Sequence, residues 1–412
     1  MSPLTQEQVV EVAEELLSSR FGGSQQLSDI EDLGGSGNAV VLRARVANSP
    51  FLPHRSVVLK YIPETGHPFE DASLLRELVA YQFTTSLAEN VRPGPVLLAH
   101  DIAQRIVVLT DSGDGYTLAE LLASSDDTKR VHLIRELGTA LGAMHAGTAG
   151  REDGYDILFS RMQRNHPEYG ESSGLRDNVL RASIIMGLQL LEAADLKSPE
   201  VVSQLAQEAA SSLSSSHSRA FTPFDLSPDN IIVADKIHFL DYEWAGFRNV
   251  IFDVACVIAG FPQFLFARPI QDSEVDVFIN AWAREVKSMW PRLAEETYLH
   301  ASITSALVGW ALSSVTAMSI GGIEELLAVP EVVDAQELDR ESTDVAARLL
   351  GQESDGPYTE DELLIRRDLY ETFEALARFS AHGSEAECSH GSCDTVHDFS
   401  ARVAARLQKP GL

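Results

Sequence analysis

The chain has 412 residues, of which 44% are hydrophobic, and a formal net charge of −29 from 32 basic and 61 acidic side chains. This apolar content supports a folded core. The negative charge argues against binding to nucleic acid or to anionic membranes, because both require a basic surface. A cationic substrate would be attracted by this charge, although net charge alone is weak support for any ligand.

The cellular location is predicted from the cysteines and the apolar segments. Cys256, Cys388 and Cys393 are an odd and small set, which fits a reducing compartment better than a disulfide scaffold. The first residues lack the basic start and apolar core of a signal peptide. The uncharged stretch 301–323 contains several Ser and Thr residues, so we expect a buried helix there and no membrane span. We therefore predict a cytoplasmic protein.

The first part of the chain is predicted to form a small sheet with about two helices. Thr5 and Gln8 make a capping box before an amphipathic helix over residues 9–17. Residues 33–38 are rich in turn-forming side chains. Alternating apolar segments predict strands, and a longer periodic segment predicts a helix at 69–87. The strands are expected at 40–46, 56–62, 96–98 and 106–110.

The rest of the chain is predicted to be mainly helical. Helical spacing covers residues 118–122, 131–145, 176–194 and 199–213, and returns from residue 252 onward. A strand–turn–strand unit at 222–242 interrupts these helices. A sheet-rich front followed by a helical back predicts an α+β protein with two lobes, residues 1–111 and 112–412.

The strongest chemical signal lies in this strand–turn–strand unit. Asp225 is followed by Asn230, then by a short apolar strand, and then by Asp241. Phosphoryl transfer needs one carboxylate to orient the attacking hydroxyl and two oxygen ligands to hold magnesium against the phosphates. A surface hairpin would use similar turn residues, but the apolar strands on both sides favour a buried hairpin with its polar ends facing a ligand.

The segment Asp225-x4-Asn230, with Asp241-Tyr242-Glu243 after it, resembles the catalytic loop and metal-binding segment of the aminoglycoside phosphotransferase and choline kinase superfamily. The resemblance implies a bilobal protein-kinase-like fold and a kinase that uses ATP and Mg²⁺ to phosphorylate a hydroxyl of a small molecule. The acceptor would be an amino sugar, an aminoglycoside, a choline-like amine or another small alcohol. Asp225 would be the catalytic base, and Asn230 and Asp241 would bind magnesium.

The front of the chain carries further parts of this resemblance in the expected order. Gly35-Ser36-Gly37-Asn38 resembles the nucleotide loop, where small residues let backbone N–H groups approach phosphates, although an ordinary hairpin is a more frequent cause of such a turn. Lys60 lies in an apolar strand, where an ammonium is costly to bury without an anion; an edge strand facing water is the alternative. The resemblance implies that Lys60 contacts the phosphates and pairs with Glu77. The alternative for Glu77 is a position on a helix face that is exposed to solvent.

The segment that joins the predicted lobes resembles a kinase hinge. Its backbone would bind adenine through Leu109, Thr110, Asp111 and Ser112, although a helix-entry turn explains Asp111 equally well. In the back lobe, the resemblance implies that acceptor choice depends on residues 150–215 and 262–380. No pattern in those stretches names a molecule.

Three other features of the sequence bear on this resemblance. The family usually has His-Gly before the catalytic Asp, where this chain has Pro223-Phe224. This departure leaves a second hypothesis, a catalytically silent nucleotide-binding regulator. Asp253 resembles the Asp that braces the catalytic loop, and His145 is predicted to be structural.

A weaker cluster of Cys388, His390, Cys393 and His397 contains residue types that bind zinc. The spacing matches no common zinc motif, so a polar loop with two reduced cysteines is the preferred interpretation.

Overall fold

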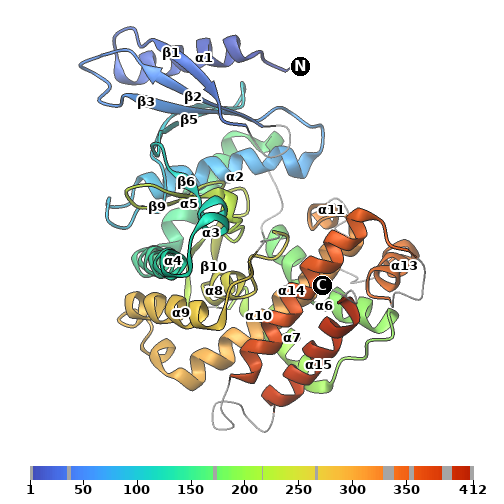
Figure 1. The fold of residues 1–412 in the computed structure, drawn as a ribbon. Coiled ribbons are helices and arrows are strands. Elements are labelled where there is room, and N and C mark those ends of the chain that lie inside the picture. Colours follow the sequence, from blue (N-terminus) through green and yellow to red (C-terminus); the bar gives the residue numbers. More distant parts are fainter. Residues whose placement is uncertain are drawn as a thin grey trace. The chain divides into compact units, whose positions relative to one another are not determined.

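The computed structural model describes residues 3–34, 39–169, 174–215, 217–264, 268–327, 338–351, 357–382 and 392–408 (Figure 1). The chain divides into two compact units. The first unit consists of Met1–Tyr116, Arg151–Glu171 and Asn230–Ala245, and the second of Thr117–Gly150, Ser172–Asp229 and Gly246–Leu412. The first unit therefore combines the N-terminal part of the chain with two later segments. The lobe boundary predicted at residue 111 stays a prediction.

The first unit contains a five-stranded antiparallel sheet with the strand order β1-β2-β3-β5-β4. A short hairpin of β8 and β9 follows later in the chain. The strands are β1 (Leu27–Asp32), β2 (Val40–Val46), β3 (Ser56–Tyr61), β4 (Leu97–Asp101), β5 (Ile106–Thr110), β8 (Ile231–Val233) and β9 (Ile237–Phe239), and β6 (Tyr116–Thr117) pairs with β8. The helices are α1 (Gln6–Phe21), α2 (Pro68–Thr85) and α5 (Glu152–Asn165), with the 3-10 turn η1 (Pro167–Tyr169). The 3-10 turn η2 (Pro228–Asn230) contains the last two residues of one segment of the second unit and the first residue of the next segment of the first unit.

The two faces of the five-stranded sheet have different neighbours. Val57, Leu59 and Tyr61 of β3 are buried in one core cluster with Val9 and Leu17 of α1, so α1 covers this face (Figure 1). Successive side chains of a strand point to opposite faces. Lys60 therefore lies on the face away from α1.

The second unit is mainly helical and contains one two-stranded ribbon, β7 (Arg219–Thr222) with β10 (Gly246–Asn249). Its shorter helices are α3 (Leu118–Ser124), α8 (Ile251–Ile258), η3 (Pro291–Ala294), α11 (Glu324–Leu327) and α13 (Arg340–Leu349). The longer ones are α4 (Asp127–Thr148), α6 (Leu175–Ala193), α7 (Glu200–Ser212), α9 (Asp272–Val286), α10 (Glu296–Ile320), α14 (Glu360–Ala381) and α15 (Ser392–Leu407).

Helix α10 is the uncharged helix expected from the sequence. By length and composition it could cross a membrane, but 78% of its most apolar window is buried inside the protein. The core helices of soluble proteins have the same properties. The burial of α10 is therefore explained by packing against the neighbouring helices α6, α7, α8 and α14.

The predicted α+β class is confirmed, with an antiparallel sheet early in the chain and a mainly helical remainder. The Thr5–Gln8 capping box is formed as expected. Strand β1 was not predicted, because its sequence LSDIED has three acidic residues and five of its six positions are exposed. An exposed edge strand of this kind shows no alternation of apolar residues for a sequence pattern to detect.

Candidate active site

Lys60, Glu77 and Asp241 form one cluster in the first unit. The Nζ atom of Lys60 donates to Oε1 of Glu77 at 2.7 Å and to Oδ1 of Asp241 at 3.0 Å. Glu77 is 17 residues from Lys60 in the chain, and Asp241 is 181 residues away. The structure thus brings together three of the side chains that the sequence predicts for nucleotide and metal binding.

Three different elements supply these side chains. Lys60 projects from β3, on the sheet face away from α1, and Glu77 comes from α2, which begins with Pro68 at its first turn. Asp71, an earlier acid of α2, accepts hydrogen bonds from the Thr65 and Gly66 amides and pairs with Arg105. Asp71 therefore holds the loop before α2, and Glu77 is the acid of this helix that meets Lys60.

Burial sets the protonation of the cluster. The side chains of Lys60, Glu77 and Asp241 are only 14%, 2% and 17% exposed. Burial disfavours the charged form of Lys60, but the carboxylates of Glu77 and Asp241 outweigh it and raise the pKa of Lys60. Burial also raises the pKa of Glu77 to about 7, since the nearby Lys60 ammonium opposes this shift only in part and Asp241 adds to it. Two carboxylates therefore share one permanently charged ammonium.

The segment around Asp241 is held by close backbone packing. Asp241 has a left-handed backbone with φ of 58°. The Phe239 amide donates to the Pro93 carbonyl at 2.8 Å, and the Tyr242 hydroxyl donates to the Phe239 carbonyl at 2.9 Å. A β-carbon on Gly94 would lie 2.3 Å from the Phe239 carbonyl oxygen and 2.7 Å from the Tyr242 hydroxyl. Only glycine fits at position 94 without moving the Asp241 segment.

Helices α2 and α5 fix the end of the same segment. The Ala245 carbonyl accepts hydrogen bonds from Arg76 of α2 at 3.1 Å and from the Tyr155 hydroxyl of α5 at 3.2 Å. The ring of Tyr81, also on α2, lies 4.9 Å from the ring of Tyr242. Helix α2 therefore supplies both the partner of Lys60 and supports for the Asp241 segment.

Asn230 lies beside Asp241 through the β8–β9 hairpin. The Asn230 carbonyl accepts a hydrogen bond from the Leu240 amide at 2.8 Å, one residue before Asp241. Asp241 contacts Lys60 through Oδ1 of its carboxylate. Carboxylate and amide oxygens are ligands that Mg²⁺ accepts together with phosphate oxygens and water. The residue types at positions 230 and 241 therefore match the oxygen donors that magnesium prefers.

The residues predicted to form a hinge, Leu109, Thr110, Asp111 and Ser112, also belong to the first unit. The Thr110 amide already donates to the Val96 carbonyl at 2.9 Å, and the Ser112 hydroxyl lies 3.3 Å from Nδ1 of His238. The Asp111 carboxylate pairs with Arg43 at 3.1 Å and accepts from the Gly113 amide. Side-chain contacts thus tie the predicted hinge to β2 and to the β8–β9 hairpin.

Arg43 is a residue that the sequence did not single out. From β2 it pairs with Glu31 and Asp114 as well as Asp111, and it donates to the Gly113 carbonyl. It therefore joins the sheet to the hinge. A single Arg in a strand gives no chemical signal of its own, and only the acids on β1 and in the hinge reveal its role.

Asp225, the predicted base, belongs to the second unit. Its Oδ1 accepts a hydrogen bond from the Ser227 amide at 3.0 Å, which closes a tight turn. Burial, together with the nearby carboxylates of Asp253 and Asp225, raises the pKa of the Cys256 thiol. Cys256 is therefore an inert, buried thiol close to the predicted base.

Two further predicted residues form a buried pair in the second unit. The Trp282 indole donates to Nδ1 of His145 at 3.0 Å, so His145 carries its proton on Nε2 and donates it to Oδ2 of Asp253 at 3.1 Å. Both ring nitrogens of His145 are thus used in packing, as expected for a structural histidine. Burial raises the pKa of Asp253, and the hydrogen bond from His145 opposes this shift.

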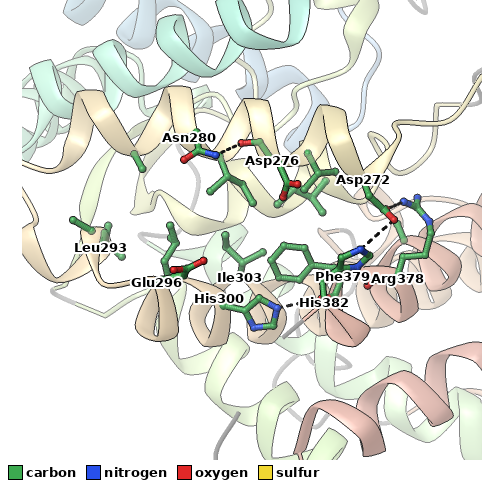
Figure 2. Close-up of a pocket in the computed structure, with 17 residues that line it drawn as sticks. Asp272, Asp276, Asn280, Leu293, Glu296, His300, Ile303, Arg378, Phe379 and His382 are labelled. Carbon is green, nitrogen blue, oxygen red and sulfur yellow. Dashed lines mark hydrogen bonds and ion pairs between the residues drawn. The ribbon is translucent and has the colours of Figure 1, made fainter. Parts of the chain in front are cut away.

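A cavity of about 350 Å³ opens in the second unit between α9, α10 and α14 (Figure 2). Ile303, Leu299 and Phe379 give it apolar walls, and Asp276 and Glu296 add carboxylates. None of the residues predicted for catalysis, nucleotide binding or metal binding lines this cavity. Most of its lining falls within 262–380, one of the ranges that the family resemblance assigns to acceptor choice.

Two predicted groups involve residues beyond those described. The loop Gly35, Ser36, Gly37 and Asn38 lies outside the described residues, as do Cys388 and His390. Cys393 is disulfide-bonded, so the expectation that both cysteines of its loop are reduced is wrong. Within the described part of the chain, no group of three or more His, Cys, Asp or Glu side chains is placed to hold a metal ion.

A family model matches a large part of the chain. A model described as the phosphotransferase enzyme family (APH) matches residues 53–295, which is more than half of the chain. The matched range includes Lys60, Glu77, Asp225, Asn230 and Asp241. A search of curated proteins finds no match.

The chain is also similar to solved structures at low sequence identity. A choline kinase from Cryptosporidium parvum Iowa II is 12% identical, with 91% of this chain and 97% of that chain covered and a TM-score of 0.47. The choline kinase LicA from Streptococcus pneumoniae is 13% identical, with coverages of 89% and 98% and a TM-score of 0.43. An ADP-bound aminoglycoside phosphotransferase is 13% identical, with coverages of 83% and 97% and a TM-score of 0.44.

Proposed function

Because the chain belongs to the phosphotransferase enzyme family, we propose that it is a kinase that uses ATP and Mg²⁺ to phosphorylate a hydroxyl group of a small molecule. The observation that carries this proposal is the cluster in which Lys60 contacts both Glu77 and Asp241. Glu77 orients the Lys60 ammonium, which can contact phosphates, and the Asp241 carboxylate can hold the metal ion that accompanies them.

The proposed division of labour follows from the chemistry of each side chain. Lys60, oriented by Glu77, binds the phosphates of the nucleotide. Asn230 and Asp241 hold magnesium, which offsets the charge that develops on the transferred phosphoryl group. Asp225 orients the acceptor hydroxyl and takes up its proton as the oxygen attacks. Most of the rate enhancement comes from positioning and electrostatics.

The acceptor is proposed by class only: an amino sugar, an aminoglycoside, a choline-like amine or another small alcohol. The net charge of −29 favours a cationic acceptor among these. ATP use also accords with the predicted cytoplasmic location. A panel of these alcohols, assayed for ADP release and for the phosphorylated product, tests the reaction and identifies the acceptor.

Asp225→Asn provides the first test of mechanism. The amide keeps the size of the side chain but cannot accept the proton, so turnover should fall by about 10²- to 10⁴-fold while ATP affinity changes little. Turnover is measured under saturating ATP, and ATP binding by calorimetry. Undiminished turnover would remove Asp225 from this role.

Asp241→Ala tests the metal site. Loss of one of two protein ligands should weaken nucleotide binding in the presence of magnesium and leave binding in EDTA nearly unchanged. The measurement is an ATP titration with and without magnesium. An equal loss under both conditions would show that Asp241 acts on the nucleotide without a metal ion.

The second hypothesis is a catalytically silent regulator that binds nucleotide. The retention of Lys60, Asp225, Asn230 and Asp241 speaks against it, since a silent protein has no need of a base. Nucleotide binding with no product from any acceptor in the panel would favour this alternative.

A further inference from the structure

Phe224, which directly precedes the predicted base Asp225, has a left-handed backbone with φ of 66°. A bulky side chain rarely adopts this conformation, because its β-carbon crowds the backbone. Strained residues of this kind persist only where the surrounding structure holds them, and they cluster at functional sites. Contacts of its side chain must therefore hold Phe224 in this conformation.

The ring of Phe224 is buried among aromatic and cationic groups, with only 7% of the residue exposed. It is stacked on Trp310 at 5.3 Å between ring centroids, with an interplanar angle of 27°. The ring of Phe252 lies at 6.4 Å, and the Arg248 guanidinium lies 5.0 Å from the centroid of the Phe224 ring. Stacking and cation–π contacts of this type stabilise a buried ring beyond the effect of its area.

The groups around the ring are fixed in turn. The Arg248 side chain is buried, and its Nε donates to Oδ1 of Asp177 at 2.7 Å. The Trp310 indole donates to the Phe252 carbonyl at 2.8 Å. These residues all belong to the second unit, as Asp225 does. The pocket around the ring is therefore formed by residues of other chain segments, and hydrogen bonds hold those residues in place.

We propose that Phe224 is a positioning residue: its buried ring holds the left-handed backbone that directs the carboxylate of Asp225. The resembled family has glycine at this position, which adopts positive φ without cost. In this chain, the packing of the buried ring compensates for the cost of positive φ at Phe224. The inference rests on the proposed role of Asp225, and it explains why Pro223-Phe224 is compatible with an active loop.

The test compares Phe224→Gly with Phe224→Ala. Both variants lose the ring, but only alanine retains the cost of positive φ. With the acceptor found in the panel, kcat should therefore fall in both, and about tenfold further in Phe224→Ala than in Phe224→Gly. The KM for ATP should stay within about twofold of wild type, because the Phe224 ring is buried among protein side chains. Equal kcat in the two variants, or a higher kcat for Phe224→Ala, would overturn the proposal.

Phe373→Ala is the matched control. Phe373 is also buried in the second unit and packs edge-on against Phe399 at 6.5 Å, but its backbone is helical, in α14. It should lose thermal stability without a selective loss of kcat. If Phe224→Ala fails to fold, Phe224→Leu takes its place, because leucine keeps an apolar side chain and the cost of positive φ while losing the stacking.

Hydrogen exchange separates this inference from the proposed function. The Ser227 amide is protected by its bond to Asp225, so its exchange rate reports the position of that carboxylate without any turnover. Exchange should be about tenfold faster in Phe224→Ala than in Phe224→Gly, and unchanged in Phe373→Ala. If these exchange rates are found but no acceptor in the panel yields a product, the proposed kinase activity is rejected and the positioning role of Phe224 is supported. Wild-type exchange at Ser227 in all variants would reject the positioning role itself.

Discussion

At the scale of single residues, the stability of the first unit depends on the buried ammonium of Lys60. Lys60 lies between two acids that are themselves largely buried, and neither acid pairs with any other Lys or Arg in the described part of the chain. Removing one partner of a buried charge pair is more costly than replacing the whole pair, because it leaves a charge without compensation. The phosphates of the proposed nucleotide would add negative charge at this position, so Lys60 would then serve both stability and binding.

A double-variant experiment tests this dependence. Lys60→Met should lower the free energy of unfolding by roughly 3 kcal/mol, since Glu77 and Asp241 then face each other without a cation. Adding Glu77→Gln should restore part of this loss, because one of the two carboxylates becomes neutral. Urea unfolding of the first variant, the double variant and Glu77→Gln alone measures the coupling. A double variant less stable than Lys60→Met would contradict the shared-ammonium arrangement.

At the scale of elements, helix α2 and the loop before β4 position the Asp241 segment. Helix α2 contributes Glu77, Arg76 and Tyr81, which contact Lys60, the Ala245 carbonyl and the Tyr242 ring. The loop approaches from the other side, where Gly94 lies directly against the Phe239 carbonyl. The orientation of Asp241 therefore depends on how closely two backbones pack, and not on a local turn alone.

Gly94→Ala should disturb this packing. The added β-carbon would come within 2.3 Å of the Phe239 carbonyl oxygen, and a backbone atom can move away only with its strand. We expect a loss of about 1–3 kcal/mol in stability, together with weaker magnesium-dependent ATP binding, because Phe239 and Tyr242 flank Asp241.

Gly154→Ala is the control for this change. Gly154 lies in α5, and no atom lies within 4 Å of its added β-carbon. Alanine favours helix, so this variant should be as stable as the wild type or slightly more stable. Thermal unfolding and an ATP titration of both variants make the comparison. If Gly94→Ala has wild-type stability and wild-type ATP affinity, the loop and the Asp241 segment can move apart without cost, and the predicted close packing does not position Asp241.

At the scale of the whole molecule, the dominant property is the net charge of −29. Charge of one sign destabilises a compact state through self-repulsion, and salt screens this repulsion over about 10 Å at 0.1 M ionic strength. The same field would attract a cationic acceptor of the proposed class and would repel nucleic acid. Solubility and acceptor encounter are therefore set by the surface as a whole, while chemistry is set by a few side chains.

Salt should stabilise this protein near neutral pH. Raising NaCl from about 20 mM to about 0.5 M should increase the unfolding temperature by a few degrees at pH 7.5, because the acidic groups then repel one another less. Near pH 4.7, the isoelectric point expected from the sequence, the increase should vanish. Scanning fluorimetry at both pH values measures the effect. A salt response of equal size at pH 4.7 would point to hydrophobic or ion-specific causes.

Local features of the site could be predicted from the residues alone. Strands β2 and β5 occupy the predicted ranges, and the pairing of Lys60 with Glu77 was expected from the family resemblance. Such features follow from rules that act over a few residues: side-chain alternation, helix capping and the spacing of a motif. The roles in phosphoryl transfer remain predictions.

Tertiary structure alone decided the rest. The resemblance implies that Lys60 and Asp241 serve the same phosphates, but only the packed structure gives the direct bond between them across 181 residues. Only the packed structure also shows that Arg43 joins β2 to the predicted hinge. The left-handed backbone at Phe224 is set by Trp310 and Arg248, which lie on distant elements. The physical reason is the same in each case: the free energy of these contacts belongs to pairs of groups that meet only when the core has packed.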